Sequence, residues 1–188
     1  MRIITGKYKG RVLETLPDKS VRPATDRVKT TIFDMLQNRL GLKGILVLDM
    51  FAGSGSLGFE ALSRGAGKVV FVDDMEEILD VMEKNAESLN CIPDTEIIRS
   101  DAMSYIEKSS RSFDLIFADP PYSYERLNEI PRTIFEKNIL NSSGYLIIEH
   151  SKRTVFDASP LFSLAVQKEF GNTRVSFFIH HKLNGEKA

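Results

Sequence analysis

The run Asp119-Pro120-Pro121-Tyr122, which follows an apolar stretch, carries the clearest chemistry in the sequence of 188 residues. The Asp119 carboxylate and the Pro120 carbonyl are two acceptors that can take both N–H bonds of an exocyclic amine and so localise its lone pair. Two successive prolines restrict the backbone and remove donors, so the carbonyls stay available. The ring of Tyr122 offers a face on which a base can stack, worth about 1–3 kcal/mol. Alone, the four residues are also compatible with a type I turn.

A second pattern, from Gly53 to Gly58, reads G-x-G-x-x-G. It lies between a strand-like run and a helical pattern, and Asp73 follows Gly53 by 20 residues, as in nucleotide-binding folds. Asp49, however, precedes the glycines, and a carboxylate there would oppose a pyrophosphate bound at the helix N-terminus. It suits a ligand with a cationic end. S-adenosylmethionine, with an ammonium and a sulfonium, is such a ligand.

The elements that must position these residues alternate between strand and helix. The sequence predicts strands at 45–50, 68–73, 95–100, 113–119 and 144–150, followed by an antiparallel pair at 163–171 and 174–182. Such alternation indicates an α/β fold with a doubly wound, mostly parallel, seven-stranded Rossmann-like sheet and an antiparallel C-terminal strand.

Acidic residues follow four successive predicted strands. Ligands of doubly wound sheets bind beyond the carboxyl ends of the strands, so we expect these acids to meet at one edge. Together they predict a ligand with several hydrogen-bond donors and a positive charge. The acids are Asp49, Asp73, Asp74, Asp101 and Asp119.

The N-terminal part of the chain is basic. Residues 1–43 carry ten Lys or Arg and four acids, a net +6 against −7 for the remainder. Residues 2–16 predict a β-hairpin with a basic tip, and a helix follows with Thr25 or Asp26 as its N-cap and Gly41 at its end. A basic arm on an acidic body is typical of contact with a phosphate backbone, although a merely solvated surface would look the same.

Composition excludes several other classes of protein. Cys91 is the only cysteine, which excludes a disulfide framework and favours an intracellular, cytoplasmic protein. The three histidines lack the spacing of a metal motif, so we expect no metal. No apolar run reaches the roughly 20 residues of a membrane span.

Several motifs, taken in order, resemble known families. D-x-F-x-G-S-G at Asp49 to Gly55 is similar to the cofactor loop of class I S-adenosylmethionine-dependent methyltransferases. DPPY resembles the (D/N)PP(Y/F) motif of those that methylate exocyclic amines of bases. With RIITGKYKGRVL, RPATDRVKTTIFDML, VVFVD and Asn85, the chain resembles the bacterial 16S rRNA guanine-N2 methyltransferase family over nearly its whole length.

This resemblance implies roles for the matched residues. It implies a basic hairpin extension at 1–20, a class I methyltransferase domain at 21–188, and 16S rRNA as partner, within a small ribosomal subunit or an assembly intermediate. Either Asp73 or Asp74 would hold the cofactor ribose. The implied catalytic residues are Asp119, Pro120 and Tyr122. The implied cofactor-binding residues are Asp49, Phe51, Gly53, Ser54, Gly55, Asp73, Asp74, Asp101 and Ala102. The implied RNA-binding residues are Arg2, Lys7, Lys9, Arg11, Arg22, Thr25 and Arg27.

Other functions stay open at this point. The DPPY motif also fits an adenine-N6 methyltransferase acting on DNA or RNA, although 188 residues leave little room for a DNA target-recognition region. A noncatalytic RNA-binding assembly factor would not need an intact motif, and a nucleotide-binding oxidoreductase is opposed by Asp49. For any base methyltransferase, the target must be flipped out or lie in a loop.

Overall fold

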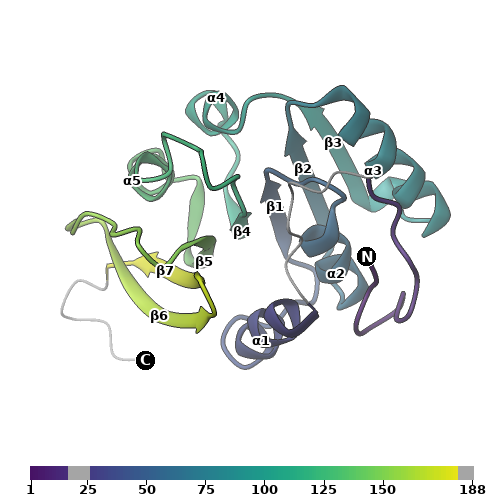
Figure 1. Ribbon diagram of the computed structural model, residues 1–188, viewed down its shortest axis with the longest axis horizontal. Coiled ribbons are helices and arrows are strands. Elements are labelled where there is room, and N and C mark those ends of the chain that lie inside the picture. Colours follow the sequence, from purple (N-terminus) through teal and green to yellow (C-terminus); the bar gives the residue numbers. More distant parts are fainter. Residues whose placement is uncertain (17–25, 182–188) are drawn as a thin grey trace.

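The computed structural model describes residues 1–16 and 26–181, which form one seven-stranded sheet with helices on both faces (Figure 1). The strand order is β3-β2-β1-β4-β5-β7-β6. Strands β1 to β5 are parallel, whereas β7 is antiparallel to both of its neighbours, β5 and β6. The strands are β1 Leu46–Met50, β2 Lys68–Asp73, β3 Thr95–Arg99, β4 Phe113–Ala118, β5 Leu140–Ser151, β6 Phe162–Phe170 and β7 Thr173–His180. The predicted fold class and its antiparallel C-terminal strand are confirmed.

Five α-helices of the described residues cover the sheet. Helices α1, α2 and α3 pack on one face and α4 and α5 on the other, each with its own apolar cluster. The helices are α1 Asp26–Gln37, α2 Ser56–Ser63, α3 Glu76–Ser88, α4 Ala102–Lys108 and α5 Glu129–Glu136, with a short 3-10 turn at Ile92–Asp94. Among them, none is long and apolar enough to cross a membrane.

The central strands are apolar throughout because both of their faces are covered. In β4, Leu115 and Phe117 point into the cluster under α1 to α3, whereas Ile116 and Ala118 join the cluster under α4 and α5. All four are at most 1% exposed. Burial on both faces is the reason that a parallel strand reads as a continuous apolar run.

Residues 1–16 fold back on themselves, as the sequence predicts, but they do not form two regular strands. Their only bridge pairs Arg2 with Val12. Several backbone N–H groups of this segment are hydrogen-bonded by side chains of the neighbouring helices and not by a partner strand. The fully buried Glu60 of α2 accepts hydrogen bonds from the N–H groups of Ile4 (2.7 Å) and Thr5 (3.1 Å). The segment is therefore built into the core and is not a free hairpin.

Buried charges fix this segment in place. The ammonium of Lys29 in α1 is fully buried and donates to the carbonyl of Arg2 (2.7 Å). Arg64 donates to Glu60 (2.7 Å), so the Glu60 carboxylate is paired as well as hydrogen-bonded. Burial lowers the pKa of Lys29, which the nearby Glu60 partly opposes. The boundary predicted at residue 20 lies outside the described residues.

Candidate active site

The sheet register brings four carboxylates to one face at the carboxyl edge. Asp49 of β1 is paired with Phe71 and Phe117, and Phe117 is paired with Ile147 of β5. All three aromatic or aliphatic partners belong to the cluster under α1 to α3. Side chains alternate along a strand, so residues two positions farther on share that face. These residues are Asp73, Asp119 and Glu149.

Asp49 lies at the base of this group and is 2% exposed. Its carboxylate accepts a hydrogen bond from the N–H of Gly58 in the first turn of α2 (2.9 Å). Burial raises the pKa of Asp49 to about 8, the Gly58 hydrogen bond opposes the shift, and the charge of Asp73 adds to it. A cation bound nearby would favour the ionised carboxylate.

The glycine loop leaves room for a ligand. Gly53 has a positive φ of 54°, and a side chain there would meet nothing within 4 Å. Its N–H donates to Asp73 (2.9 Å), so Asp73 is directed at the loop while Asp74 is exposed to solvent. This geometry favours Asp73 as the residue for the ribose. The carbonyl of Ser54 accepts from the buried Asn85 (3.2 Å), which ties the loop to α3.

Gly58, the last glycine of the pattern, has a packing role. A β-carbon on Gly58 would lie 2.3 Å from the ring of Phe71 on β2, closer than real contacts permit. Helix α2 can therefore approach the sheet only with glycine here, and its N-terminus is brought close to Asp49. The G-x-G-x-x-G spelling reflects helix packing as well as ligand binding.

The two loops at this edge meet through aromatic rings. Phe51, which follows β1, has a positive φ of 58° and packs edge-on against Tyr124 with ring centroids 4.8 Å apart. Among the described residues, the buried hydroxyls of Tyr124 and Ser56 lack hydrogen-bond partners. Buried polar groups are normally satisfied, so each of these hydroxyls has hydrogen-bonding capacity left for a ligand. With the open Gly53, they fit S-adenosylmethionine.

Asp101 and Ala102 lie where β3 passes into α4, a helix that the sequence interpretation missed. Asp101 is exposed and caps α4 by accepting a hydrogen bond from the N–H of Ser104 (2.8 Å). Ala102 is the first residue of α4 and is buried. The carboxylate predicted to mark the adenine thus has a structural partner already. Its role toward a cofactor stays a prediction.

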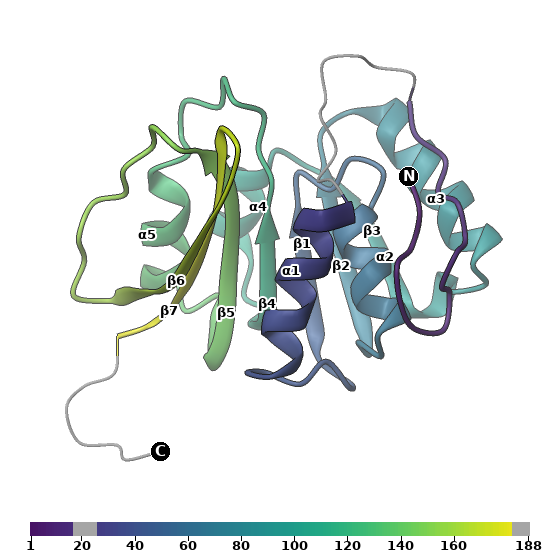
Figure 2. The ribbon, with the colours of Figure 1, turned by 60° about the horizontal axis from the view of Figure 1, so that its bottom comes forward.

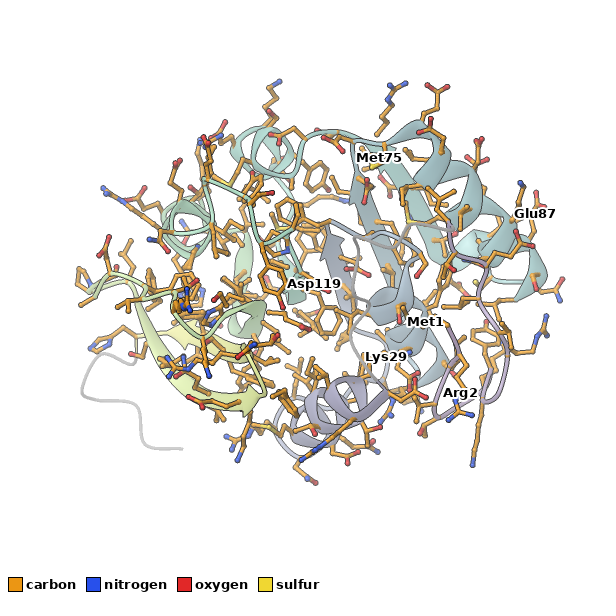
Figure 3. All side chains as sticks on the ribbon, viewed as in Figure 1. Met1, Arg2, Lys29, Met75, Glu87 and Asp119 are labelled. Carbon is orange, nitrogen blue, oxygen red and sulfur yellow. The ribbon has the colours of Figure 1, made fainter. Side chains whose placement is uncertain are left out.

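Asp119 lies directly after β4, near the middle of the molecule (Figure 3). The residue is half-buried. Burial raises the pKa of Asp119 well above its usual range, and the charges of Glu149 and Asp49 raise it further. The carbonyl of Pro120 accepts no hydrogen bond within the described part of the chain. The Asp119 carboxylate and the Pro120 carbonyl come from adjacent residues, and the Pro120 carbonyl keeps its acceptor capacity for a ligand.

The sequence interpretation also missed Glu149. Its signal was present, because the strand GYLIIEH places Glu149 two residues after Ile147 and hence on the Asp119 face. Neighbouring strands lie about 4.8 Å apart, so Glu149 is next to Asp119. His150 points to the other face, where it contacts Ser176 (2.8 Å) and the edge of Phe156.

Tyr122 combines an exposed ring with an anchored hydroxyl. The residue is 67% exposed, and its hydroxyl is hydrogen-bonded to the hydroxyl of Thr173 (2.8 Å). Thr173 is the first residue of β7 and is buried. Strand β7 therefore holds the ring at the carboxyl edge with its faces accessible, as stacking on a base requires.

The predicted RNA-binding residues are not gathered around these carboxylates. Lys7 donates its N–H to Ser63, the last residue of α2, at the opposite edge of the sheet (2.7 Å), and Lys9 belongs to the same turn. Figure 2 shows this turn of the N-terminal segment at the edge where the strands begin. Arg11 donates to Ser88 at the end of α3 (3.0 Å to its hydroxyl).

The other predicted RNA-binding residues are closer to α1. Arg2 is paired with Asp26 (2.9 Å) and lies at the margin of the molecule, apart from Asp119 (Figure 3). Arg27 is exposed on the first turn of α1. Arg22 and Thr25 lie outside the described residues. No group of three His, Cys, Asp or Glu side chains suited to a metal ion occurs in residues 1–16 and 26–181.

The strand order, the glycine loop after β1 and the DPPY motif after β4 define a class I methyltransferase. The family model described as conserved hypothetical protein 95 matches residues 1–179, and the chain belongs to this family. This confirms the resemblance drawn from the sequence.

Individual proteins of known sequence or structure agree with this family. A Bacillus subtilis protein named "Putative rRNA methyltransferase YlbH" is 34% identical over 183 residues, covering 95% of this chain and 98% of its own. "Ribosomal RNA small subunit methyltransferase D" of Haemophilus influenzae is 35% identical over 155 residues, covering 81% and 79%. The solved structure "Putative methyltransferase yhhF from Escherichia coli" superposes with a TM-score of 0.85 at 28% identity, covering 97% and 99%.

Proposed function

We propose that this protein transfers a methyl group from S-adenosylmethionine to the exocyclic N2 amine of a guanine in 16S rRNA, in the cytoplasm. The substrate is the small ribosomal subunit or one of its assembly intermediates. The observation that supports this most directly is the parallel pairing of β1 with β4, which places Asp119 and Pro120 next to the loop that follows β1, with the exposed Tyr122 two residues after Pro120. The names of the Bacillus and Haemophilus relatives support rRNA as the substrate.

The residues of this site are suited to activate an amine. S-adenosylmethionine supplies, when bound, a methyl group on a positively charged sulfur. The guanine amine is a poor nucleophile because its lone pair is delocalised into the ring. Asp119 and the carbonyl of Pro120 would each accept one of its N–H bonds, which localises the lone pair on nitrogen. Tyr122 would stack on the extruded base and fix its plane. Positioning and electrostatics would carry the rate.

The raised pKa of Asp119 adds a requirement to this mechanism. A protonated Asp119 could not accept the N–H of the amine with that oxygen. A cationic cofactor next to Asp49 and Asp119 would lower both pKa values, because a nearby positive charge favours the carboxylate. Cofactor binding would thus favour the ionised form of Asp119, which is the form that accepts the substrate amine.

Methylation of defined substrates tests the proposal. The protein is incubated with labelled S-adenosylmethionine and either 16S rRNA, small subunits or DNA, and the digested nucleosides are identified. N2-methylguanosine from rRNA or small subunits is the expected product. N6-methyladenosine, or label in DNA, would support the adenine alternative instead. An Asp119→Ala variant should bind cofactor but form no product, and full turnover by this variant would remove Asp119 from the mechanism.

A further inference from the structure

The end of β5 lies at the same edge as Tyr122. Ser151, the last residue of β5, is paired with Thr173, which holds the Tyr122 hydroxyl. The chain then continues into Lys152, whose N–H donates to the carbonyl of Asn172 (3.0 Å). Lys152 is therefore fixed at the rim of the site, one residue beyond the pair that carries the Tyr122 anchor.

The distance from the carboxylates to this rim is short. Glu149 lies beside Asp119, and Lys152 follows it by three residues. A strand rises about 3.3 Å per residue, so the two backbone positions are about 10 Å apart. Lys152 and Arg153 are both exposed and lie in the turn that follows β5, so their long side chains are free to meet a ligand at this rim.

The acidic side chains at this edge would repel the phosphates of an RNA substrate unless basic residues offset them. Four acidic side chains lie at this edge, and in their ionised form they repel the phosphates on either side of a base that enters the site. Arg174 of β7 is engaged by Glu169 (2.7 Å). Lys152 and Arg153 form no ion pair within residues 1–16 and 26–181 and can serve a ligand. By contrast, Lys7 and Lys9 lie at the opposite edge.

We propose that Lys152 and Arg153 bind RNA backbone phosphates next to the target nucleotide and thereby hold it over Tyr122. This inference rests on the proposed function, because it assumes an RNA substrate. It adds a binding surface on the β5–β6 connection, at the catalytic edge, that the basic N-terminal residues do not provide. The contact is electrostatic, so it contributes affinity and register without base specificity.

Salt-dependent binding of 16S rRNA tests this surface. The dissociation constant of the RNA complex is measured for the wild type and for Lys152→Ala/Arg153→Ala. The salt concentration is varied from about 0.05 to about 0.5 M. The matched control is Lys108→Ala/Lys137→Ala, which removes two exposed lysines at the ends of α4 and α5, at the opposite edge. Cofactor affinity and kcat/KM for RNA are measured in parallel.

Two phosphate contacts should reduce the slope of log K against log salt by about 1.4, at about 0.7 per contact with single-stranded nucleic acid. If the wild type and the variant bind RNA equally at 1 M salt, this difference in slope makes the variant bind roughly 25-fold more weakly at 0.1 M salt. Cofactor affinity should not change, kcat/KM for RNA should fall together with the RNA affinity, and the control should bind and turn over like the wild type. A Lys152→Ala/Arg153→Ala variant with the control's slope and affinity would overturn the inference. Failure of the wild type to methylate any RNA would instead refute the proposed function.

Discussion

Asp49→Asn should change how the stability of the protein depends on pH. The folded state holds the Asp49 pKa at about 8, whereas an unfolded aspartate has a pKa of about 3.9. Because the folded pKa is raised, the stabilisation is fully present below the unfolded pKa and is lost as pH rises through the folded one. Between these values the native state holds one more proton than the unfolded state, so each pH unit costs about 1.4 kcal/mol.

The amide oxygen introduced by the Asp49→Asn change can still accept the Gly58 N–H but binds no proton. Both proteins share all other titratable groups, so the pH dependence that those groups contribute largely cancels in the comparison. Urea unfolding at pH 5 and pH 7 should show the wild type losing about 2.7 kcal/mol relative to Asp49→Asn. Asp74→Asn, the same change at an exposed neighbouring acid, serves as the control and should show little such dependence. A difference between wild type and Asp49→Asn that does not vary with pH would refute a buried, desolvated carboxyl group.

Four further tests, which use five substitutions, address other parts of the structure. Because burial and neighbouring acids raise the pKa of Asp119, kcat/KM should increase with pH in the wild type, whereas Asp119→Asn should give a lower, flatter profile; equal profiles would contradict this. Tyr122→Phe and Thr173→Val should each lower kcat/KM about fivefold, because each removes the same hydrogen bond. The double variant should lose little more activity than either single variant. Additive losses would show that the two side chains are not coupled. Asn85→Ala should lower the unfolding free energy by about 3 kcal/mol, since it leaves backbone groups of the N-terminal segment unsatisfied; a change below about 1 kcal/mol would show that water replaces these bonds. Gly58→Ala should cost about 1–3 kcal/mol by calorimetry through overlap with Phe71, and a neutral result would mean that the ring can move aside.

The sheet and most of its acids could be predicted from the sequence because their signals are local. A buried parallel strand reads as an apolar run, and the acid that ends it reads as a ligand at the carboxyl edge. Helix α4 was missed because it has only seven residues and because its capping acid, Asp101, was interpreted as a ligand. Glu149 was missed because it stands inside the predicted strand 144–150, before His150, whereas the acids taken as ligands were those at or just after the ends of strands.

The remaining features depend on residues far apart in the sequence. Tyr122 and Thr173 are 51 residues apart, and no local pattern marks them as partners. The position of Lys7 depends on where α2 ends, because Ser63 accepts its N–H. The sequence showed that these lysines are basic and turn-forming but not which edge of the sheet they would occupy. Hairpin strands were expected at 2–16 because a buried glutamate that replaces a partner strand has no sequence signature.

The docked N-terminal segment has a consequence for biosynthesis. The backbone of Glu14 is paired with Asn85, 71 residues later, and Ile3 and Leu13 are almost fully buried. At about 5–20 residues per second, a ribosome needs roughly 4–14 s to make the intervening chain. During that time these apolar side chains lack their binding surface on α2 and α3. Residues 1–16 therefore depend on residues that are synthesised later for their burial, and a fusion partner attached ahead of them would be present throughout this exposed interval.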